Sequence, residues 1–462
     1  MKYFLWFCRI VVGGTFIVSG LVKANDPLGF SYKLEEYFAE SALNLPFLEP
    51  ASLFLAILAC LAEVVLGFAV IVGGRMKLAT ACILWLTLFF GWLTAYTATC
   101  DPQGKYEVVV NGVKELRDVT CVTDCGCFGD AMKGSLGRSL TPWESFYKDL
   151  ILLIFVLPLF FVSWFRKPRP SEAAGEGGPG IAFNTGGDDK VLLPGALILV
   201  ALWCWVFGWA FFLWFTLTGL AGYLVIKRLA QGVKAEWLTA LWITVFSLGF
   251  IWYCYAHLPL KDYRAYAVGK SISEQKALAK PPVNEIFLVY KDKSTGEEKE
   301  YPGNNYPWND SVWVATHEFV KQRVNVIDPG VPSQVQDFRL TDNDGVDITD
   351  DVLAEPTPVL LIVVKTIGEA NTSCLPGIKT LTDAASSAGW YVYGVTATGH
   401  DETEAFRHEH QLAFDFVTCD EITLKTMIRS NPGVVLLKEG RVMGQWHCND
   451  VPSLEEAKKS VE

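Results

Sequence analysis

Apolar residues are concentrated in the first 256 positions of the chain, whereas charged residues gather after Lys261. A run of about 20 apolar residues is long enough to cross a bilayer as a helix. Such runs predict membrane spans at residues 3–22, 52–72, 78–98, 147–165 and 237–256. The first run contains Arg9 and lacks a small-residue cleavage site, so we interpret it as a retained span rather than a signal peptide. The pattern therefore predicts a multi-pass membrane protein.

Residues 191–226 form one further apolar run, which is too long for an ordinary span and barely long enough for two. A helical hairpin that turns near Gly208 would return the chain to the side from which it entered. A single tilted helix would instead place the C-terminal half on the opposite side. The hairpin puts Lys227 and Lys234 on the cytoplasmic side, as the positive-inside rule prefers. We therefore predict two helices here and seven spans in total.

Positive charges between the spans indicate the orientation. Arg75 and Lys77 lie between the second and third spans, and a second basic cluster at 166–169 follows the fourth. The positive-inside rule places both clusters in the cytoplasm, which leaves the loop at 99–146 and the chain after 261 outside. The Gly-, Ala- and Glu-rich segment 171–190 is then a cytoplasmic linker. In a bacterium, this arrangement describes an inner-membrane protein with a periplasmic C-terminal domain.

Four of the twelve cysteines stand in the loop at 99–146, namely Cys100, Cys121, Cys125 and Cys127. Thiols at the edge of a membrane can pass electrons to a lipid-soluble acceptor such as a quinone. A Cys-x-Cys ring is too tight for relaxed disulfide geometry, which favours Cys125 and Cys127 as an oxidising pair, with Cys100 and Cys121 as a second pair. One or two purely structural disulfides remain an alternative. Four thiolates also suit zinc, but Cys-x3-Cys-x-Cys is not the usual knuckle spacing, and we expect no metal.

One face of the first span carries Arg9, Gly13, Phe16, Gly20 and Lys23, because these residues recur every three or four positions. Glycines on such a face allow a neighbouring helix to approach closely. An unpaired charge inside a bilayer costs about 2.5–3.5 kcal/mol on insertion scales, so Arg9 needs a partner. We predict that this partner is Glu63 in the second span. The pair either locks the bundle or helps to orient a quinone or relay a proton.

These residues carry a family resemblance. Arg9, Gly13, Phe16, Gly20 and Lys23, the motifs at 26–27 and 63–67, and the Cys-Gly-Cys-Phe-Gly motif at 125–129 together resemble the DoxX/MauE group of redox-associated membrane proteins. The resemblance implies a four-helix bundle over residues 1–170, loosely similar to the quinone-linked disulfide enzymes DsbB and vitamin K epoxide reductase. It also implies an association with disulfide formation, as in methylamine utilisation. The charges inside the bilayer, Arg9, Lys23 and Glu63, are the candidate cofactor-binding residues.

The remaining chain divides into additional transmembrane helices at 191–260, a connector with a small β element at 261–330, and an α/β domain at 331–462. Strands are predicted at 359–364, 390–396, 434–437 and 442–446, and helices at 375–387, 402–411 and 421–429. The segment 429–442 resembles the proline loop and final hairpin of the thioredoxin fold. Where thioredoxins carry Cys-x-x-Cys, this chain has the single Cys374. The domain is therefore expected to be a binding scaffold or to use one thiol.

The net charge of −11 argues against nucleic acid as a partner. The fold class predicted is an α-helical membrane bundle followed by a periplasmic thioredoxin-like domain. The predicted function is thiol–disulfide exchange at the periplasmic face coupled to quinone, with membrane lipid and a periplasmic thiol or envelope protein as partners. The alternative is a non-catalytic membrane-anchored accessory or assembly factor, whose thioredoxin-like domain binds an envelope partner.

Overall fold

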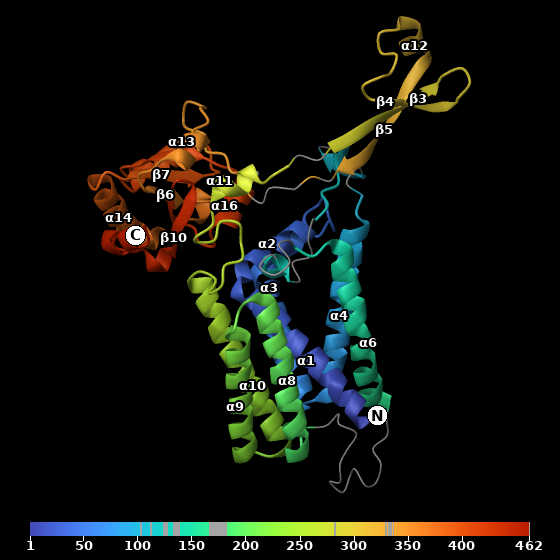
Figure 1. Ribbon diagram of the computed structural model, residues 1–462, viewed down its shortest axis with the longest axis vertical. Helices are drawn as coiled ribbons and strands as arrows, with labels where there is room; N and C mark the ends of the chain where they lie inside the picture. The colour runs from blue at the N-terminus through green and yellow to red at the C-terminus, as the bar shows by residue number, and fades with distance from the viewer. Residues whose placement is uncertain are drawn as a thin grey trace. The chain divides into compact units, whose positions relative to one another are not determined.

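The computed structural model describes residues 1–101, 104–110, 113–122, 128–132, 139–165, 183–280, 283–328, 330, 335 and 337–461. The chain divides into two compact units (Figure 1). The first unit comprises Met1–Arg264 with Trp446–Asp450, and the second comprises Ala265–Gln445 with Val451–Glu462. We call them the membrane unit and the C-terminal unit.

The membrane unit is built from seven helices that are long and apolar enough to cross a bilayer, counted over the described residues. They are α1 (Lys2–Asn25), α3 (Ser52–Val72), α4 (Met76–Thr99), α6 (Pro142–Phe165), α8 (Gly186–Phe207), α9 (Phe211–Leu229) and α10 (Gly232–Ala256). The prediction of seven helical spans is thus confirmed, and the protein is a multi-pass membrane protein.

The hairpin between α8 and α9 turns at Gly208, as predicted. Gly208 adopts a φ of 61°, which favours glycine, and the Trp209 amide donates to the Cys204 carbonyl to close the turn. The predicted linker 171–190 is too long at its C-terminal end. Thr185 and Asp188 form a capping box, and α8 therefore begins at Gly186. The capping box marks the start of the helix more reliably than the Gly- and Ala-rich composition marks the end of the linker. Residues 171–182 of the linker lie outside the described residues.

Close glycine contacts hold α1 against α3. A Cβ atom at Gly13 would lie 2.8 Å from the Gly67 carbonyl oxygen, and a Cβ atom at Gly20 would lie 2.7 Å from the Val64 side chain. The predicted glycine face of the first span therefore packs against a neighbouring helix. These contacts also set the antiparallel register, in which Gly13 faces Gly67 and Gly20 faces Val64.

Two smaller elements of the membrane unit were not predicted. The helix α2 (Pro27–Phe38) begins where the Asp26 carboxylate accepts from the Gly29 amide at 2.8 Å, with Pro27 in the first turn. Strands β1 (Lys105–Val110) and β2 (Val113–Asp118) pair antiparallel within the loop at 99–146, which we call the cysteine loop. The signal for α2 was the Asp-Pro pair, which starts helices as readily as turns.

The C-terminal unit contains a five-stranded sheet in the order β10-β9-β6-β7-β8. The strands are β6 (Val359–Val363), β7 (Tyr391–Thr396), β8 (Asp415–Thr418), β9 (Gly433–Lys438) and β10 (Arg441–His447). The first three run parallel and β9 pairs antiparallel with β6. All five residues of β6 are buried, so the core lies on both faces of the central strand.

Helices flank this sheet, and a cis peptide bond at Asn431–Pro432 precedes β9. The helices are α11 (Ile272–Ala277), α13 (Thr349–Ala354), α14 (Leu375–Ser387), α15 (His400–Glu409), α16 (Glu421–Met427) and α17 (Leu454–Lys459). This order and topology is the thioredoxin fold, as predicted. The strand β8 was missed, since a four-residue strand carries little periodicity.

A separate three-stranded antiparallel sheet forms the predicted small β element (Figure 1). Its order is β4-β3-β5, and its elements are β3 (Val283–Asp292), β4 (Glu298–Pro302), α12 (Ser311–Thr316) and β5 (His317–Asp328). The turn between β3 and β4 closes where the Gly296 amide donates to the Asp292 carbonyl at 2.8 Å. Tyr290 and Trp313 pack at a ring-centroid distance of 4.7 Å.

Candidate functional site

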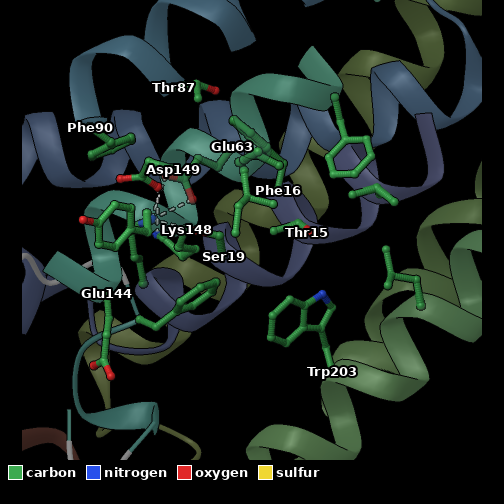
Figure 2. Close-up of a pocket in the computed structure, with 18 residues that line it drawn as sticks. Thr15, Phe16, Ser19, Glu63, Thr87, Phe90, Glu144, Lys148, Asp149 and Trp203 are labelled. Carbon is green, nitrogen blue, oxygen red and sulfur yellow. Dashed lines mark hydrogen bonds and ion pairs between the residues drawn. The ribbon is translucent and has the colours of Figure 1, made fainter. Parts of the chain in front are cut away.

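A cavity of about 520 Å³ lies within the membrane unit (Figure 2). It is bounded by α1, α3, α4, α6 and α8. Its wall is mainly apolar, and the aromatic side chains in it are Phe16, Phe90, Phe128, Tyr147, Phe155 and Trp203. Its charged side chains are Lys23, Glu63, Glu144, Lys148 and Asp149. Figure 2 shows Glu63, Lys148 and Asp149 on one side of the cavity and Trp203 on the other.

Lys23 and Glu63 form a buried ion pair at this cavity. The Lys23 ammonium lies 2.7 and 2.8 Å from the two Glu63 carboxylate oxygens and donates to the Ser19 hydroxyl at 2.8 Å. The side chains are only 2% and 3% exposed. A buried pair of this kind is stable only when hydrogen bonds satisfy both groups, as they do here. Two of the three predicted cofactor-binding residues thus line one cavity.

The predicted ion pair between Arg9 and Glu63 is wrong. Arg9 donates to the carbonyls of Val70 at 2.7 Å and Ile71 at 2.8 Å, and to the side-chain oxygen of Asn184 at 2.6 Å. The α1–α3 register places Arg9 beside the end of α3, whereas Lys23 is 14 residues further along α1, or about 21 Å at 1.5 Å per residue. Glu63 is therefore closer to Lys23, and Arg9 is not among the residues that line the cavity.

The region around Arg9 joins the α8–α9 hairpin to the bundle. Asn184 donates to the Ile71 carbonyl at 3.1 Å and to Asp189 at 2.9 Å. Asp189 in turn accepts from Lys227 at 2.5 Å and from the Tyr223 hydroxyl at 2.9 Å. This network connects α1, α3, α8 and α9, so Arg9 has a structural environment distinct from that of the cavity.

A second charged pair at the cavity was missed in the sequence. Lys148 lies 3.0 Å from the Asp149 carboxylate, and the Thr94 hydroxyl donates to Asp149 at 3.3 Å. The Lys148 ammonium also lies 4.7 Å from the ring centroid of Phe128. The only sequence signal was an adjacent pair of charges in the first half of α6. Its meaning depends on which face of α6 turns inward, which the sequence does not show.

The cysteine loop is partly described. Cys100 and Cys121 form a disulfide with a Cα–Cα distance of 5.8 Å, which confirms that these two cysteines pair. Cys125 and Cys127 lie outside the described residues, so their predicted role stays a prediction. Phe128, the residue that follows Cys127 in the sequence, is buried and lines the cavity.

The C-terminal unit has no free thiol at the position of a thioredoxin active site. Cys374 precedes α14 and is disulfide-bonded, so the prediction of a lone thiol there is wrong. Cys448, which follows β10 and counts with the membrane unit, is disulfide-bonded as well. Cys419 is free but only 4% exposed, and burial raises the pKa of its thiol to about 11. A thiol with such a high pKa is almost entirely protonated at neutral pH and reacts slowly.

The loop after β6 is tied to the cis-proline segment by Asn431. Its side-chain oxygen accepts from the Lys365 amide at 3.0 Å, and its side-chain nitrogen donates to the Thr366 carbonyl at 2.9 Å. The Asn431 carbonyl accepts from the Asn371 amide at 2.8 Å. This set of bonds fixes the loop that stands where a Cys-x-x-Cys would be.

Residues 1–103 match the family described as methylamine utilisation protein MauE. No curated protein matches the chain. Among solved structures, StoA from Bacillus subtilis is 20% identical, with 27% of this chain and 96% of StoA covered and a TM-score of 0.22.

Two further solved structures match a similar share of the chain. A putative protein disulfide isomerase from Bacteroides thetaiotaomicron is 16% identical over 27% of this chain and 82% of that chain, with a TM-score of 0.22. The bacterioferritin comigratory protein of Xanthomonas campestris is 16% identical over 28% of this chain and 90% of that chain, with a TM-score of 0.21. The protein is therefore a multi-pass membrane protein whose N-terminal helices match the MauE family and whose C-terminal unit has a thioredoxin fold.

Proposed function

We propose that this protein is a membrane thiol–disulfide oxidoreductase that transfers electrons from Cys125 and Cys127 to a membrane quinone. The observation that carries the proposal is the cavity in the membrane unit. It contains the buried Lys23–Glu63 pair, and Phe128 in its wall directly follows Cys127 in the sequence. Cys127 is therefore the sequence neighbour of a side chain in the cavity wall.

The residues present fit a quinone. The volume of about 520 Å³ falls within the range of about 300–1,000 Å³ that is typical of small-molecule sites. Aromatic and aliphatic side chains suit an apolar ring and tail, and the Lys148 ammonium can donate to a ring carbonyl. The Lys23 ammonium already donates to Glu63 and Ser19, so its contribution is positive charge beside the cavity. Both lysines are already paired with carboxylates, which offsets the cost of placing ammonium groups beside an apolar cavity.

The proposed chemistry balances. A bound quinone supplies an acceptor for two electrons and two protons. Oxidation of the Cys125 and Cys127 thiols to one disulfide releases two electrons and two protons, which match that capacity. The disulfide is then reduced by thiol–disulfide exchange with a substrate dithiol, directly or through Cys100 and Cys121. With a quinone bound, Lys23 would place positive charge beside the acceptor, and Glu63 keeps the lysine oriented.

The orientation of the chain supports a site on the periplasmic side of a bacterial inner membrane. Arg75 and Lys77 stand between α3 and α4, and Lys227 and Arg228 end α9. If these charges are cytoplasmic, the cysteine loop between α4 and α6 faces an oxidising compartment, where disulfides persist. A periplasmic or envelope protein with reactive thiols is then the substrate.

One observation favours a second function. The C-terminal unit has a thioredoxin fold but no Cys-x-x-Cys, and its Cys374 is already disulfide-bonded. A fold that lacks its usual dithiol can still bind partners. In this alternative, the protein is a membrane-anchored accessory factor, and the loop disulfides only stabilise it.

The deciding experiment measures the redox state of the loop thiols in cells. Cys125 and Cys127 are alkylated before and after reduction, with and without depletion of quinone. We expect a reduced fraction that increases when quinone is removed, and we expect Cys125→Ser to trap substrates as mixed disulfides. Cys82→Ser serves as a control because Cys82 is a free cysteine within α4. Loop thiols that stay oxidised regardless of quinone, with no mixed disulfide, would favour the accessory function.

A further inference from the structure

The helix α8 completes the cavity. It lies beyond residues 1–103, the part of the chain that matches MauE, yet it contributes Leu199 and Trp203 to the cavity wall. Glycines bring it close to α1, because a Cβ atom at Gly14 would lie 2.8 Å from Leu199 and one at Gly195 would lie 2.4 Å from Ile10. The added hairpin is therefore part of the site and not only a connection to the C-terminal unit.

Aromatic contacts fix the position of Trp203. Its indole stacks on Phe207 at a centroid distance of 5.6 Å and lies 5.7 Å from the ring of Phe128. Phe128 also lies 5.5 Å from Phe207, so the three rings contact one another. Figure 2 shows the indole of Trp203 projecting from α8 towards Thr15 and Phe16 on α1. Trp203 thus contacts Phe128 and lines the same cavity.

The indole N–H of Trp203 has no hydrogen-bond acceptor among the described residues, although the nitrogen is buried. A buried donor without a partner is unfavourable, and such groups are rare in native structures. The same side chain lines the cavity, across from Glu63, Lys148 and Asp149. A ligand with a carbonyl oxygen on its ring would supply the missing acceptor while its ring packs against the aromatic cluster.

We propose that Trp203 is a ligand-positioning residue that holds a quinone ring from the α8 side, opposite Lys23 and Glu63. This inference rests on the proposed quinone-linked function and extends it. The aromatic face contributes packing, and the N–H contributes one hydrogen bond to a ring carbonyl. The α8–α9 hairpin then sets the orientation of the ring relative to the cysteine loop.

The test is direct binding to the full-length protein, purified in detergent and stripped of endogenous quinone. The probes are a short-chain benzoquinone and a short-chain naphthoquinone, measured by equilibrium dialysis. We expect Trp203→Ala to weaken binding by about tenfold or more, and Trp203→Phe by about fivefold, since the latter keeps a ring but removes one hydrogen bond worth a factor of that order. Trp205→Ala is the matched control, because Trp205 lies on the same helix and is 80% exposed.

The outcomes separate the two proposals. If the wild type binds a quinone and Lys23→Met abolishes binding, but both Trp203 variants bind within twofold of the wild type, the role of Trp203 is overturned and the proposed function stands. If the wild type binds neither quinone, both proposals are overturned. Trp203→Phe guards against a folding defect in Trp203→Ala, and equal thermal midpoints for Trp203→Phe and Trp205→Ala verify that both variants are folded.

Discussion

The membrane unit and the C-terminal unit both contain cysteines, but they surround them differently. In the membrane unit, the Cys100–Cys121 disulfide lies in the loop at 99–146. Phe128 of the same loop borders a cavity with two charged pairs. In the C-terminal unit, Cys374 is disulfide-bonded and Cys419 is buried with a raised pKa. The fold usually associated with dithiol chemistry therefore presents no free reactive thiol among its described residues, whereas the helical bundle has the features of a redox site.

The difference shows that a fold and its usual chemistry can separate. The thioredoxin topology is retained in full, including the cis-proline, yet Asn431 holds the loop that would carry the dithiol. Function depends on the groups placed at a site rather than on the topology that carries them. Under the proposed function, the membrane unit transfers electrons and the C-terminal unit binds a partner, and four predictions test this division of roles.

The largest expected effect comes from the loop thiols. Cys125→Ser or Cys127→Ser should abolish quinone-dependent oxidation of a substrate dithiol, because neither sulfur alone can form the disulfide. Cys374→Ser should leave that rate within about twofold, since no step of the proposed reaction uses it. The measurement is the rate of quinone reduction by purified protein. Loss of activity in Cys374→Ser, at normal protein level, would move the chemistry to the C-terminal unit.

Breaking the buried pair at the cavity should strongly destabilise the membrane unit. Glu63→Gln leaves the Lys23 ammonium without its carboxylate, which typically costs about 3–5 kcal/mol in a buried site. The double variant Lys23→Met, Glu63→Leu should recover much of the stability but not quinone binding. The thermal midpoint in detergent is the measurement.

An exposed pair provides the control for the Glu63 variant. Glu455 and Lys458 in α17 are 2.9 Å apart, but their side chains are 78% and 43% exposed. Glu455→Gln should change the stability of the C-terminal unit by less than about 1 kcal/mol. Equal effects of Glu63→Gln and Glu455→Gln would contradict the buried role of Glu63.

A smaller effect is expected at the cis-proline loop. Asn431→Ala removes two side-chain hydrogen bonds to Lys365 and Thr366 and should destabilise the C-terminal unit by about 1–3 kcal/mol. Pulse proteolysis of the full-length protein in urea measures the change. Quinone binding by the membrane unit should be unaffected, and a decrease in binding would contradict the division of roles.

The smallest effect concerns pH. The pKa of Cys419 is raised from 9.0 to about 11 in the folded protein, chiefly because burial disfavours the thiolate. Between these values the unfolded chain loses the proton while the folded chain keeps it, so this site stabilises the fold below pH 9 and that contribution is lost as pH rises towards 11. Relative to Cys419→Ala, the wild type should lose about 1 kcal/mol between pH 8 and pH 10. Parallel pH profiles for the two proteins would contradict this expectation.

Local sequence signals determined most of the secondary structure. Long apolar runs and the glycine at Gly208 are features that act within one or two helical turns, so the seven helices could be predicted. The capping box at Thr185 is also local, but the prediction overlooked it. The same holds for α14, whose predicted range of 375–387 agrees with Leu375–Ser387. The pairing of Cys100 with Cys121 could also be predicted, because pairing Cys125 with Cys127 leaves these two in the same loop.

The contents of the site were decided only by the tertiary structure. Which helix faces another, and in what register, depends on contacts between residues far apart in the sequence, such as Gly13 with Gly67. That register pairs Glu63 with Lys23 rather than with Arg9. It also turns Lys148 and Trp203 towards a common cavity, although neither residue stands out in its own helix. The sequence determines helices through local periodicity, but a cavity is defined by packing among helices, and packing is a property of the whole fold.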